Sequence, residues 1–312
     1  MLVLLDGFWG SGKSMVKMLL NGHPNIRVSP IQESIVSSFY RNRKLFKYFK
    51  YKDVRVIRNI LADSYYYDLQ RLKFKNFNFY AFEKDLFHSI SHLKIWKPNI
   101  LIILIYKKII IHLFKKKNNK KIVFLEDNKV ESYEFFLKNF KSSKIIYVER
   151  NIEGIIASLI KRKKKKNDFF THSYKNFNFE YLVNRLRIPS QILKNDLMVK
   201  KLKIKYPEKI YICKFDNLIF KNASEMKKIC NFLKVTFDKR VLTSNKFDAN
   251  IGQSEVSLNK IIHNPIKILK SNEIKFLQNF YKISINLTVA KFILYQIKYH
   301  SMRFIKKIFY NT

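Results

Sequence analysis

Residues 7–14 read Gly7-Phe8-Trp9-Gly10-Ser11-Gly12-Lys13-Ser14 and lie between an apolar run, Leu2–Leu5, and a helical pattern, Ser14–Asn21. The chain has only six glycines, and three of them are in this segment. Glycines 10 and 12 can adopt positive φ, so that successive backbone N–H groups turn inward and form an anion-binding nest. The helix that begins near Lys13 adds its positive dipole end, the Lys13 ammonium and the Ser14 hydroxyl. The segment matches G-x-x-x-x-G-K-[ST] between a strand and a helix, and therefore predicts a phosphate-binding loop.

Short apolar, β-rich runs alternate along the chain with helical patterns. The strand-like runs are of the kind that is buried in a parallel sheet, and they are Leu2–Leu5, Ile122–Leu125, Ile145–Val148 and Ile210–Phe215. The helical patterns between them cover Ser14–Asn21, Ser132–Asn139, Gly154–Lys166 and Ala223–Leu233. This alternation predicts an α/β fold, a three-layer P-loop-type architecture with a mostly parallel central sheet flanked by helices.

No internal repeat and no linker rich in Gly, Ser or Pro divides the sequence, so we expect a single domain over residues 1–312. Residues 35–121 are rich in Lys, Tyr and Phe and show little strand pattern, which predicts a helical insertion. Residues 262–312 show a helical pattern that is basic on one face, which predicts a helical C-terminal tail.

The sequence carries 62 Lys and Arg against 23 Asp and Glu, a formal net charge of +39. Twelve of these basic residues are Arg and 50 are Lys, a skew that is expected from an AT-rich coding sequence. We therefore use the charge only as a weak indication of partners: it favours anionic ligands, and nucleic acid is not the expected partner. A basic protein that binds a membrane or a nucleic acid without catalysis is kept as a further alternative.

The two cysteines, Cys213 and Cys230, lie in a predicted strand and a predicted helix, so we expect free thiols and a cytoplasmic location. The chain opens on an apolar strand without a preceding basic region, and no signal peptide is expected. The apolar stretch Ile100–Phe114 is interrupted by Lys107 and Lys108 and is shorter than the about 20 apolar residues that span a bilayer. Peripheral contact with a membrane is left open.

A phosphate-binding loop alone does not identify the phosphorylated ligand. A kinase that uses Mg-ATP also needs a carboxylate at the end of a second strand to hold Mg²⁺. The segment Lys121–Asp127 offers Glu126 and Asp127 at such a strand end. A P-loop nucleotide kinase with Asp127 as the Mg²⁺ ligand is therefore the alternative function.

Two further segments extend the pattern beyond the loop. His23-Pro24-Asn25-Ile26 and then Glu33 follow the first helix, while the strand Lys144–Val148 leads into Arg150, with Ser158 eight residues later. Together with the loop, these segments resemble the sulfotransferase family, whose members transfer a sulfuryl group from PAPS (3′-phosphoadenosine 5′-phosphosulfate). The resemblance covers about residues 1–35 and 122–240, and it implies a PAPS-dependent enzyme that needs no metal ion.

The resemblance implies a role for each motif residue. The 5′-phosphosulfate of PAPS would be held by the loop residues Gly10, Ser11, Gly12, Lys13 and Ser14. The 3′-phosphate would be bound by Arg150, whose guanidinium can make bidentate hydrogen bonds, and by Ser158. Lys129 would neutralise the transferring sulfonate, and Lys13 is the candidate for contact with the bridging oxygen of the leaving group.

Sulfuryl transfer also needs a general base that accepts the proton of the acceptor hydroxyl or amine. Glu33 is the candidate, because it is the only acid between Asp6 and Asp53, and carbohydrate-type members of the family place a Glu shortly after the His-Pro turn. His88 and His92 are the alternatives for this role. His23 is expected to be structural.

The position of Glu33 favours a saccharide hydroxyl as the acceptor, with Tyr65–Tyr67 as aromatic surfaces that could stack on sugar rings. Other small hydroxylated acceptors stay open.

The sequence also departs from the family pattern. Gly10 stands where the family has a basic residue, and Lys13 stands where Thr is usual. Asn151-Ile152 replaces Asp-Pro, and the candidate for covering the nucleotide is the segment Asn250–Ser254.

Overall fold

The computed structural model describes residues 1–62, 64, 78–114, 121–126, 129–163, 187–242 and 269–285. The chain divides into two compact units, which are described separately below. The first unit comprises residues 1–7, 12–149 and 198–261, and the second comprises residues 8–11, 150–197 and 262–312. The expected single domain over residues 1–312 stays a prediction.

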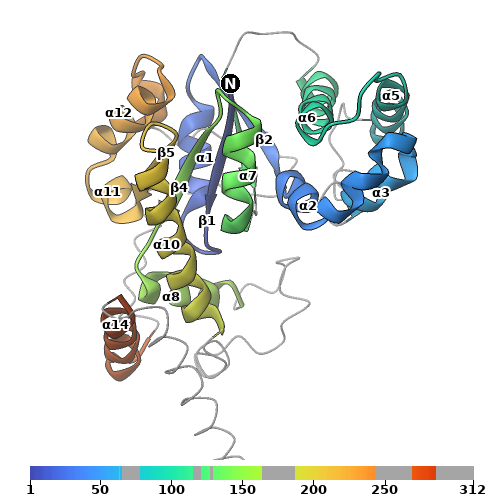
Figure 1. The fold of residues 1–312 in the computed structure, drawn as a ribbon. Coiled ribbons are helices and arrows are strands. Elements are labelled where there is room, and N and C mark those ends of the chain that lie inside the picture. Colours follow the sequence, from blue (N-terminus) through green and yellow to red (C-terminus); the bar gives the residue numbers. More distant parts are fainter. Residues whose placement is uncertain are drawn as a thin grey trace, which may run out of the picture. The chain divides into compact units, whose positions relative to one another are not determined.

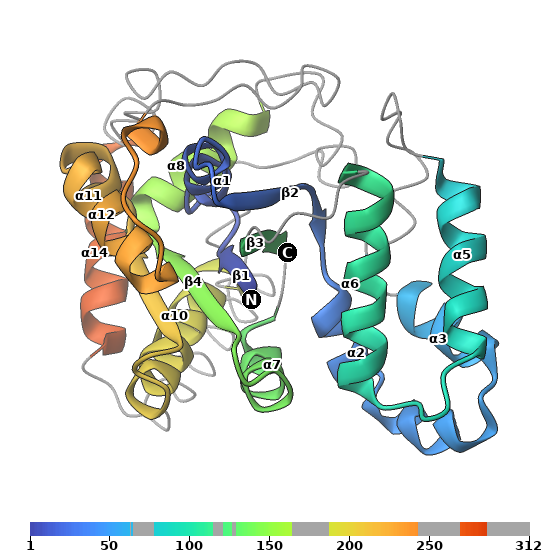
Figure 2. The ribbon, with the colours of Figure 1, turned by 90° about the horizontal axis from the view of Figure 1, so that it is seen from above.

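A five-stranded parallel sheet forms the centre of the first unit (Figures 1 and 2). Its strands, in spatial order, are β2 (Ile26–Glu33), β3 (Lys121–Glu126), β1 (Leu2–Gly7), β4 (Lys144–Glu149) and β5 (Ile210–Lys214). The middle strand β1 pairs with β3 on one side and with β4 on the other, so that Leu5 lies opposite both Leu125 and Ile146. All pairings within the sheet are parallel, which confirms the predicted sheet.

The hydrophobic pattern predicted four of these strands and missed β2. Pro30 lies inside β2, and a proline has no N–H to donate to a neighbouring strand, so it is confined to sheet edges and irregular positions. The structure satisfies both conditions, because β2 is an edge strand and its register against β3 shifts between Val28 and Gln32. A strand of this kind carries no continuous apolar run, and its sequence therefore resembles that of a loop.

Alternate residues of the central strand enter two separate apolar cores. Val3 and Leu5 belong to one core, and Leu4 between them belongs to the other. The first core includes residues of α1 (Lys13–Asn21), α11 (Phe215–Phe220), α12 (Asn222–Leu233) and the 3-10 helix η5 (Lys239–Leu242). The second includes residues of the 3-10 helix η3 (Val130–Ser132), of α7 (Tyr133–Asn139) and of the insertion. Burial on both faces explains why the central strands are apolar throughout, and it confirms the three predicted layers.

The insertion is helical wherever the structure describes it. It comprises α2 (Ile35–Arg41), the 3-10 helix η1 (Arg43–Tyr51), α3 (Val54–Ala62), α5 (Phe79–Ser91) and α6 (Pro98–Phe114). Figure 2 shows α5 and α6 running side by side, and the core between them includes Phe82, Leu86 and Ile105. No helix among the described residues is long and apolar enough to cross a bilayer.

The second unit has a small core of its own. Three helical segments contribute to it: α8 (Ile152–Lys163), residues 187–197 of α10 (Arg187–Lys205) and α14 (Ser271–Ile285). Ile156, Ile192, Leu277 and Phe280 are buried in this core. The helix α14 lies within residues 262–312, so the expected helical tail is confirmed over residues 271–285.

Candidate functional site

The backbone of the glycine loop has the conformation that the sequence predicted. Gly10 has a φ of +83° and Gly12 a φ of +102°, both in the left-handed region that side chains rarely adopt. Gly12 has no room for a larger residue, and Gly10 has little. A Cβ on Gly12 would lie 2.2 Å from the Phe215 ring, and one on Gly10 would lie 3.3 Å from the carbonyl oxygen of Ile155. The loop backbone is therefore fixed by its surroundings as well as by its own torsions.

Helix α1 begins at the loop without a side-chain cap. Its N-cap is Gly12, and the first turn closes with the hydrogen bond from the Met15 amide to the Gly12 carbonyl at 3.0 Å. Helix starts present backbone donors and a positive dipole end, and no serine or aspartate side chain covers them here. The hydroxyl of Ser11 is buried and finds no hydrogen-bond partner among the described residues. An uncapped helix start suits a bound anion, and so does a buried hydroxyl without a partner among the described residues.

The Lys13 ammonium is held by a carboxylate that sequence reasoning missed. Lys13 is only 7% exposed, and its Nζ lies 3.3 Å from Oδ1 of Asp6, which is 1% exposed. The same Oδ1 accepts a hydrogen bond from the Gly7 amide at 2.7 Å. Asp6 thus joins the end of β1, the opening of the loop and the start of α1. Its signal in the sequence is a single acid at the end of an otherwise apolar strand, directly before the loop.

In the second unit, Arg150 contacts the loop. Its side chain is largely buried, with 9% of the residue exposed, and its Nη1 donates a hydrogen bond to the carbonyl of Gly10 at 2.8 Å. Gly154 makes room for this guanidinium, because a Cβ there would lie 2.7 Å from Nε of Arg150. The sequence did not single out Gly154, although a glycine in the first turn of a helix is a signal of close packing.

Ser158 lies beside the same loop residue. A Cβ on Gly10 would lie 3.4 Å from the Ser158 hydroxyl oxygen, so the hydroxyl faces the loop backbone closely. Eight residues separate Arg150 from Ser158 in the chain, and a helix of that length rises by about 12 Å. The two side chains still converge on Gly10, because the long Arg150 side chain extends to the loop while the middle of α8 packs against it. The structure thus brings the two predicted 3′-phosphate residues together.

The departure at Asn151-Ile152 leaves the start of α8 intact. The Oδ1 of Asn151 accepts a hydrogen bond from the Gly154 amide at 3.0 Å, which is the N-cap interaction that an aspartate also provides. Ile152 occupies the first helical position, where proline is favoured but not required, and its side chain is buried in the core of the second unit.

Glu33 and Lys129 are placed at the carboxyl edge of the sheet in the first unit. Glu33 is the last residue of β2, and its partner in the register of β3 is Glu126. Lys129 is exposed, and its backbone amide donates a hydrogen bond to the hydroxyl of Ser37 in α2 at 2.9 Å. Because the strands are parallel, their carboxyl ends share the edge from which the glycine loop leaves β1.

Three histidines have structural environments. His23 is buried, its Nδ1 accepts the Asn25 amide at 3.0 Å, and its Nε2 lies 2.8 Å from the carbonyl of Thr236. This arrangement requires a proton on Nε2 and fits the structural role expected for His23.

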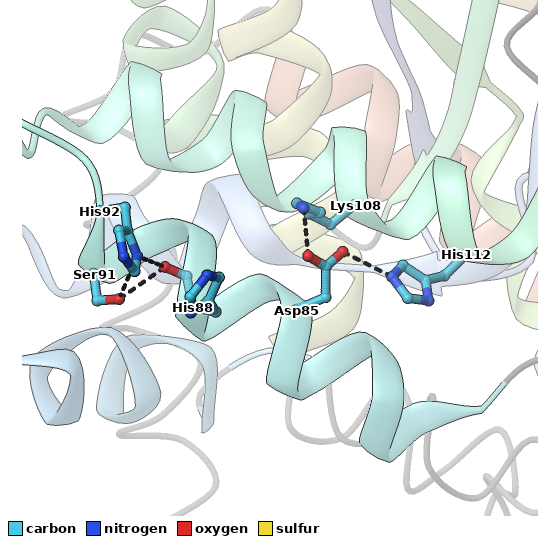
Figure 3. A network of polar contacts seen from close by, with 6 residues as sticks. All are labelled: Asp85, His88, Ser91, His92, Lys108 and His112. Carbon is cyan, nitrogen blue, oxygen red and sulfur yellow. Dashed lines mark hydrogen bonds and ion pairs between the residues drawn. The ribbon is translucent and has the colours of Figure 1, made fainter.

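The other two, His88 and His92, lie near the end of α5, where the His92 Nδ1 is 2.8 Å from the carbonyl of His88 (Figure 3). In both ribbon views α5 lies beyond α6 from the sheet, so neither histidine is favoured over Glu33 as a base.

Figure 3 also shows the contacts between α5 and α6. Asp85 accepts hydrogen bonds from Lys108 at 2.6 Å and from His112 at 2.9 Å, and these donors hold the pKa of its carboxyl below the usual range. The three side chains join the two helices of the insertion. No cluster of three metal-ligating side chains occurs in the part of the chain that the structure describes.

Several sequence predictions lie outside the described residues, namely the Tyr65–Tyr67 stacking surface, the Mg²⁺ ligand Asp127 and the covering segment Asn250–Ser254.

Comparison with known proteins identifies the family. A model of the sulfotransferase domain matches residues 3–261. The sulfotransferase domain from the Synechococcus PCC 7002 olefin synthase has a similar fold, with a TM-score of 0.53 at 12% identity, over 89% of this chain and 94% of that one. The sulfotransferase domain from the curacin biosynthetic pathway has a TM-score of 0.50 at 15% identity, over 89% of this chain and 96% of that one. No curated protein matches the chain. Since the family model covers the glycine loop, Arg150 and Ser158 within one match, the chain belongs to the sulfotransferase family and is a sulfotransferase.

Proposed function

We propose that this sulfotransferase uses PAPS as its donor and transfers the sulfuryl group to an acceptor hydroxyl or amine, with a saccharide hydroxyl as the favoured acceptor. The observation that carries this proposal is the hydrogen bond from Arg150 to the carbonyl of Gly10. This hydrogen bond joins Arg150, the candidate for binding the 3′-phosphate, to the glycine loop, the candidate for binding the 5′-phosphosulfate. A donor with phosphate groups at two positions requires both motifs.

The residues at the loop fit the 5′-phosphosulfate. The positive φ at Gly10 and Gly12, the uncapped start of α1 and the buried hydroxyl of Ser11 all favour an anion there. Ser14 is partly exposed in the first turn of α1 and can donate its hydroxyl. The Lys13 ammonium would stabilise the charge that develops on the bridging oxygen as the bond to sulfur breaks.

Arg150 and Ser158 fit the 3′-phosphate. Arginine recognises phosphate through two parallel hydrogen bonds from its planar guanidinium. A largely buried guanidinium also binds an anion more strongly than an exposed one, because solvent screens it less. Ser158 is partly exposed, and its hydroxyl can donate a further hydrogen bond.

The donor supplies an activated sulfuryl group, and the protein must supply proton transfer and charge neutralisation. Glu33 is proposed to accept the proton of the acceptor hydroxyl, and its place at the carboxyl edge of the sheet supports this role. Lys129 is proposed to neutralise the sulfonate in transit. Its backbone amide is bonded to Ser37 in α2, and α2 begins two residues after Glu33. The saccharide acceptor rests on the Glu33 position alone.

The donor is tested by thermal shift with adenosine 3′,5′-bisphosphate and with ATP, each with Mg²⁺ and with EDTA. We expect the bisphosphate to stabilise the protein in EDTA. Stabilisation by Mg-ATP alone would refute the proposal and favour the kinase alternative with Asp127. Asp127, the Mg²⁺ ligand of that alternative, lies outside the described residues.

The role of Arg150 is tested by comparing ligands with and without the 3′-phosphate. Arg150→Ala should weaken bisphosphate binding about tenfold to a hundredfold, the range for hydrogen bonds to a charged group, and should leave adenosine 5′-monophosphate nearly unaffected. Arg240→Ala is the matched control, because Arg240 is an exposed arginine that pairs with Asp238. Equal losses for the two nucleotides would remove the proposed role. Transfer of labelled sulfate onto a panel of glycans and small alcohols then identifies the acceptor.

A further inference from the structure

The segment 43–59 presents an unusual outer surface in the insertion. It covers η1 and the first part of α3, and it contains seven cations and one carboxylate, a formal charge of +6. All seven cations are exposed, and two tyrosines are exposed among them. We name this set the Lys/Tyr surface, and it consists of Arg43, Lys44, Lys47, Tyr48, Lys50, Tyr51, Lys52, Arg55 and Arg58.

The aromatic rings of this surface point outward although the same segment could have buried them. Tyr48 is 40% exposed and Tyr51 is 67% exposed, whereas Phe49 between them is buried against the core and makes an edge contact with Trp96. The fold of η1 is therefore anchored by its phenylalanines, and its tyrosines remain available to a partner.

Each exposed tyrosine carries a lysine beside its ring. The Nζ of Lys47 lies 4.9 Å from the centre of the Tyr48 ring, and that of Lys50 lies 4.8 Å from the centre of the Tyr51 ring. The result is a pair of amphipathic units, each with an aromatic ring and an ammonium group side by side. The single carboxylate, Asp53, is already bound by Arg55, with Nη2 and Oδ2 2.9 Å apart.

We propose that the Lys/Tyr surface docks on an anionic lipid bilayer and holds the enzyme at the membrane surface. Tyrosine rings are enriched at the level of lipid headgroups, and lysines near them extend their ammonium groups to the anionic headgroups. Several clustered cations are also needed for firm attachment to an anionic leaflet. The proposal does not depend on the identity of the sulfuryl donor or acceptor.

A polyanionic glycan is the competing partner, and the composition of the surface argues against it. The cations of this surface would bind the anionic groups of such a glycan by charge, but attraction by charge gives no role to the two exposed tyrosine rings. Paired rings and ammonium groups on a helix surface match a headgroup layer better than a hydroxylated chain.

The test measures binding of the full chain to phosphatidylcholine vesicles with about 30% phosphatidylserine, in about 0.1 M NaCl, where the Debye length is about 10 Å. Each cation at such a surface contributes about a fivefold change in affinity, so K47Q/K50Q/K52Q should bind about a hundredfold more weakly. The control K84Q/K141Q/K228Q removes the same charge from three exposed lysines on different elements. The vesicle affinity of this control should fall by no more than about fivefold, since we expect at most one of these lysines to face the membrane. Equal losses for the two variants would show attraction by net charge alone and would overturn the proposal.

A second variant separates the membrane from a soluble polyanion. Tyr48→Ser with Tyr51→Ser keeps the charge and removes both rings, so vesicle binding should fall by about tenfold through lost burial of apolar surface, while binding to soluble heparin should not change. If the tyrosine variant binds vesicles as well as the parent does, or if K47Q/K50Q/K52Q loses heparin binding but keeps vesicle binding, the surface serves a polyanion and the proposal is wrong. Far-UV circular dichroism and unfolding temperatures verify that each variant is folded.

Discussion

Replacing Gly12 by alanine should destabilise the first unit strongly, because the backbone torsion and the neighbouring side chain both disfavour a Cβ at this position. The φ of +102° places the residue in the left-handed region, where an L side chain costs about 1–2 kcal/mol. The new methyl group would also lie 2.2 Å from the Phe215 ring, which is buried in the core that α1 and α12 share. Moving that ring in a packed core costs about 1–3 kcal/mol.

The expected loss of stability is therefore about 2–5 kcal/mol, a large part of the ~5–15 kcal/mol that folds a typical protein. Because about 1 kcal/mol corresponds to about 2 °C in a chain of this size, the melting temperature should fall by about 4–10 °C. Gly10→Ala should cost less, about 1–3 kcal/mol, since its φ of +83° is also strained but its nearest contact is 3.3 Å away.

The chain provides its own control in Gly22, which ends α1 with a φ of −71° in the ordinary helical region. Gly22→Ala should be neutral or stabilising by up to about 1 kcal/mol. Urea and thermal unfolding measure all three variants, and Phe215→Leu should cost about 1–3 kcal/mol less in the Gly12→Ala background than in the parent if the ring is the obstacle. Equal stability of Gly12→Ala and Gly22→Ala would refute the described loop conformation, and an equal cost of Phe215→Leu in both backgrounds would refute the contact with Phe215.

Three further outcomes are expected. Asp6→Asn removes the carboxylate that holds the Lys13 ammonium, so the variant should unfold at a lower temperature than the parent. Adenosine 3′,5′-bisphosphate should raise the melting temperature of the variant more than that of the parent, because the bound anion takes the place of the lost carboxylate. Equal shifts of the two melting temperatures would contradict this competition. Burial raises the pKa of the Cys230 thiol to about 11 and also raises the pKa of the Cys213 thiol. Near pH 8, alkylation of both thiols should therefore be at least about a hundredfold slower in the native protein than in the unfolded chain. Mass spectrometry after pulses of iodoacetamide measures the two rates. Hydrogen bonds from Lys108 and then from His112 lower the pKa of Asp85 from 3.8, so its contribution is present above pH 3.8 and is lost as the pH falls through the lowered value. Asp85→Asn should thus be less stable than the parent at neutral pH, by less than about 1 kcal/mol because the carboxylate is partly exposed, and the difference should vanish in acid; a difference that persists there would argue against the ion pair.

The sequence predicted the sheet because the central strands are buried on both faces and therefore uniformly apolar. Leu4 and Leu5 pack into different cores, and only apolar residues satisfy both. The edge strand β2 does not have to be apolar on both faces. Pro30 within it also argues against a strand, so no alternation of apolar and polar residues identifies β2. The prediction failed where tertiary position, rather than composition, determines the strand.

The candidate site shows a similar division. The positive φ at Gly10 and Gly12 follows from the clustering of glycines, and it was predictable. The ion pair between Asp6 and Lys13 depends on how a helix start folds back over a strand end, which residue spacing alone does not determine. The resemblance paired Arg150 with Ser158 but predicted no contact between Arg150 and Gly10, which are 140 positions apart in the chain.

The departures from the family pattern were harder to judge from the sequence than from the structure. Asn151 stands where the family has aspartate, and its side chain caps α8 as an aspartate would. Lys13 stands in place of threonine, and its ammonium forms an ion pair with Asp6. Asp6 is not part of the family pattern quoted above.

The central strand β1 is synthesised well before both of its neighbours in the sheet, β3 and β4. Leu2 pairs with Ile122, and Val3 pairs with Lys144. At a translation rate of ~5–20 residues per second, roughly 7–30 s pass between the synthesis of Val3 and that of its partner on β4, Lys144, and during that time β1 lacks at least one of its two neighbours. Nascent chains that stop before residue 144 should therefore engage chaperones through the apolar residues of β1, and the contact between Arg150 and the glycine loop can form only after β4 has been made.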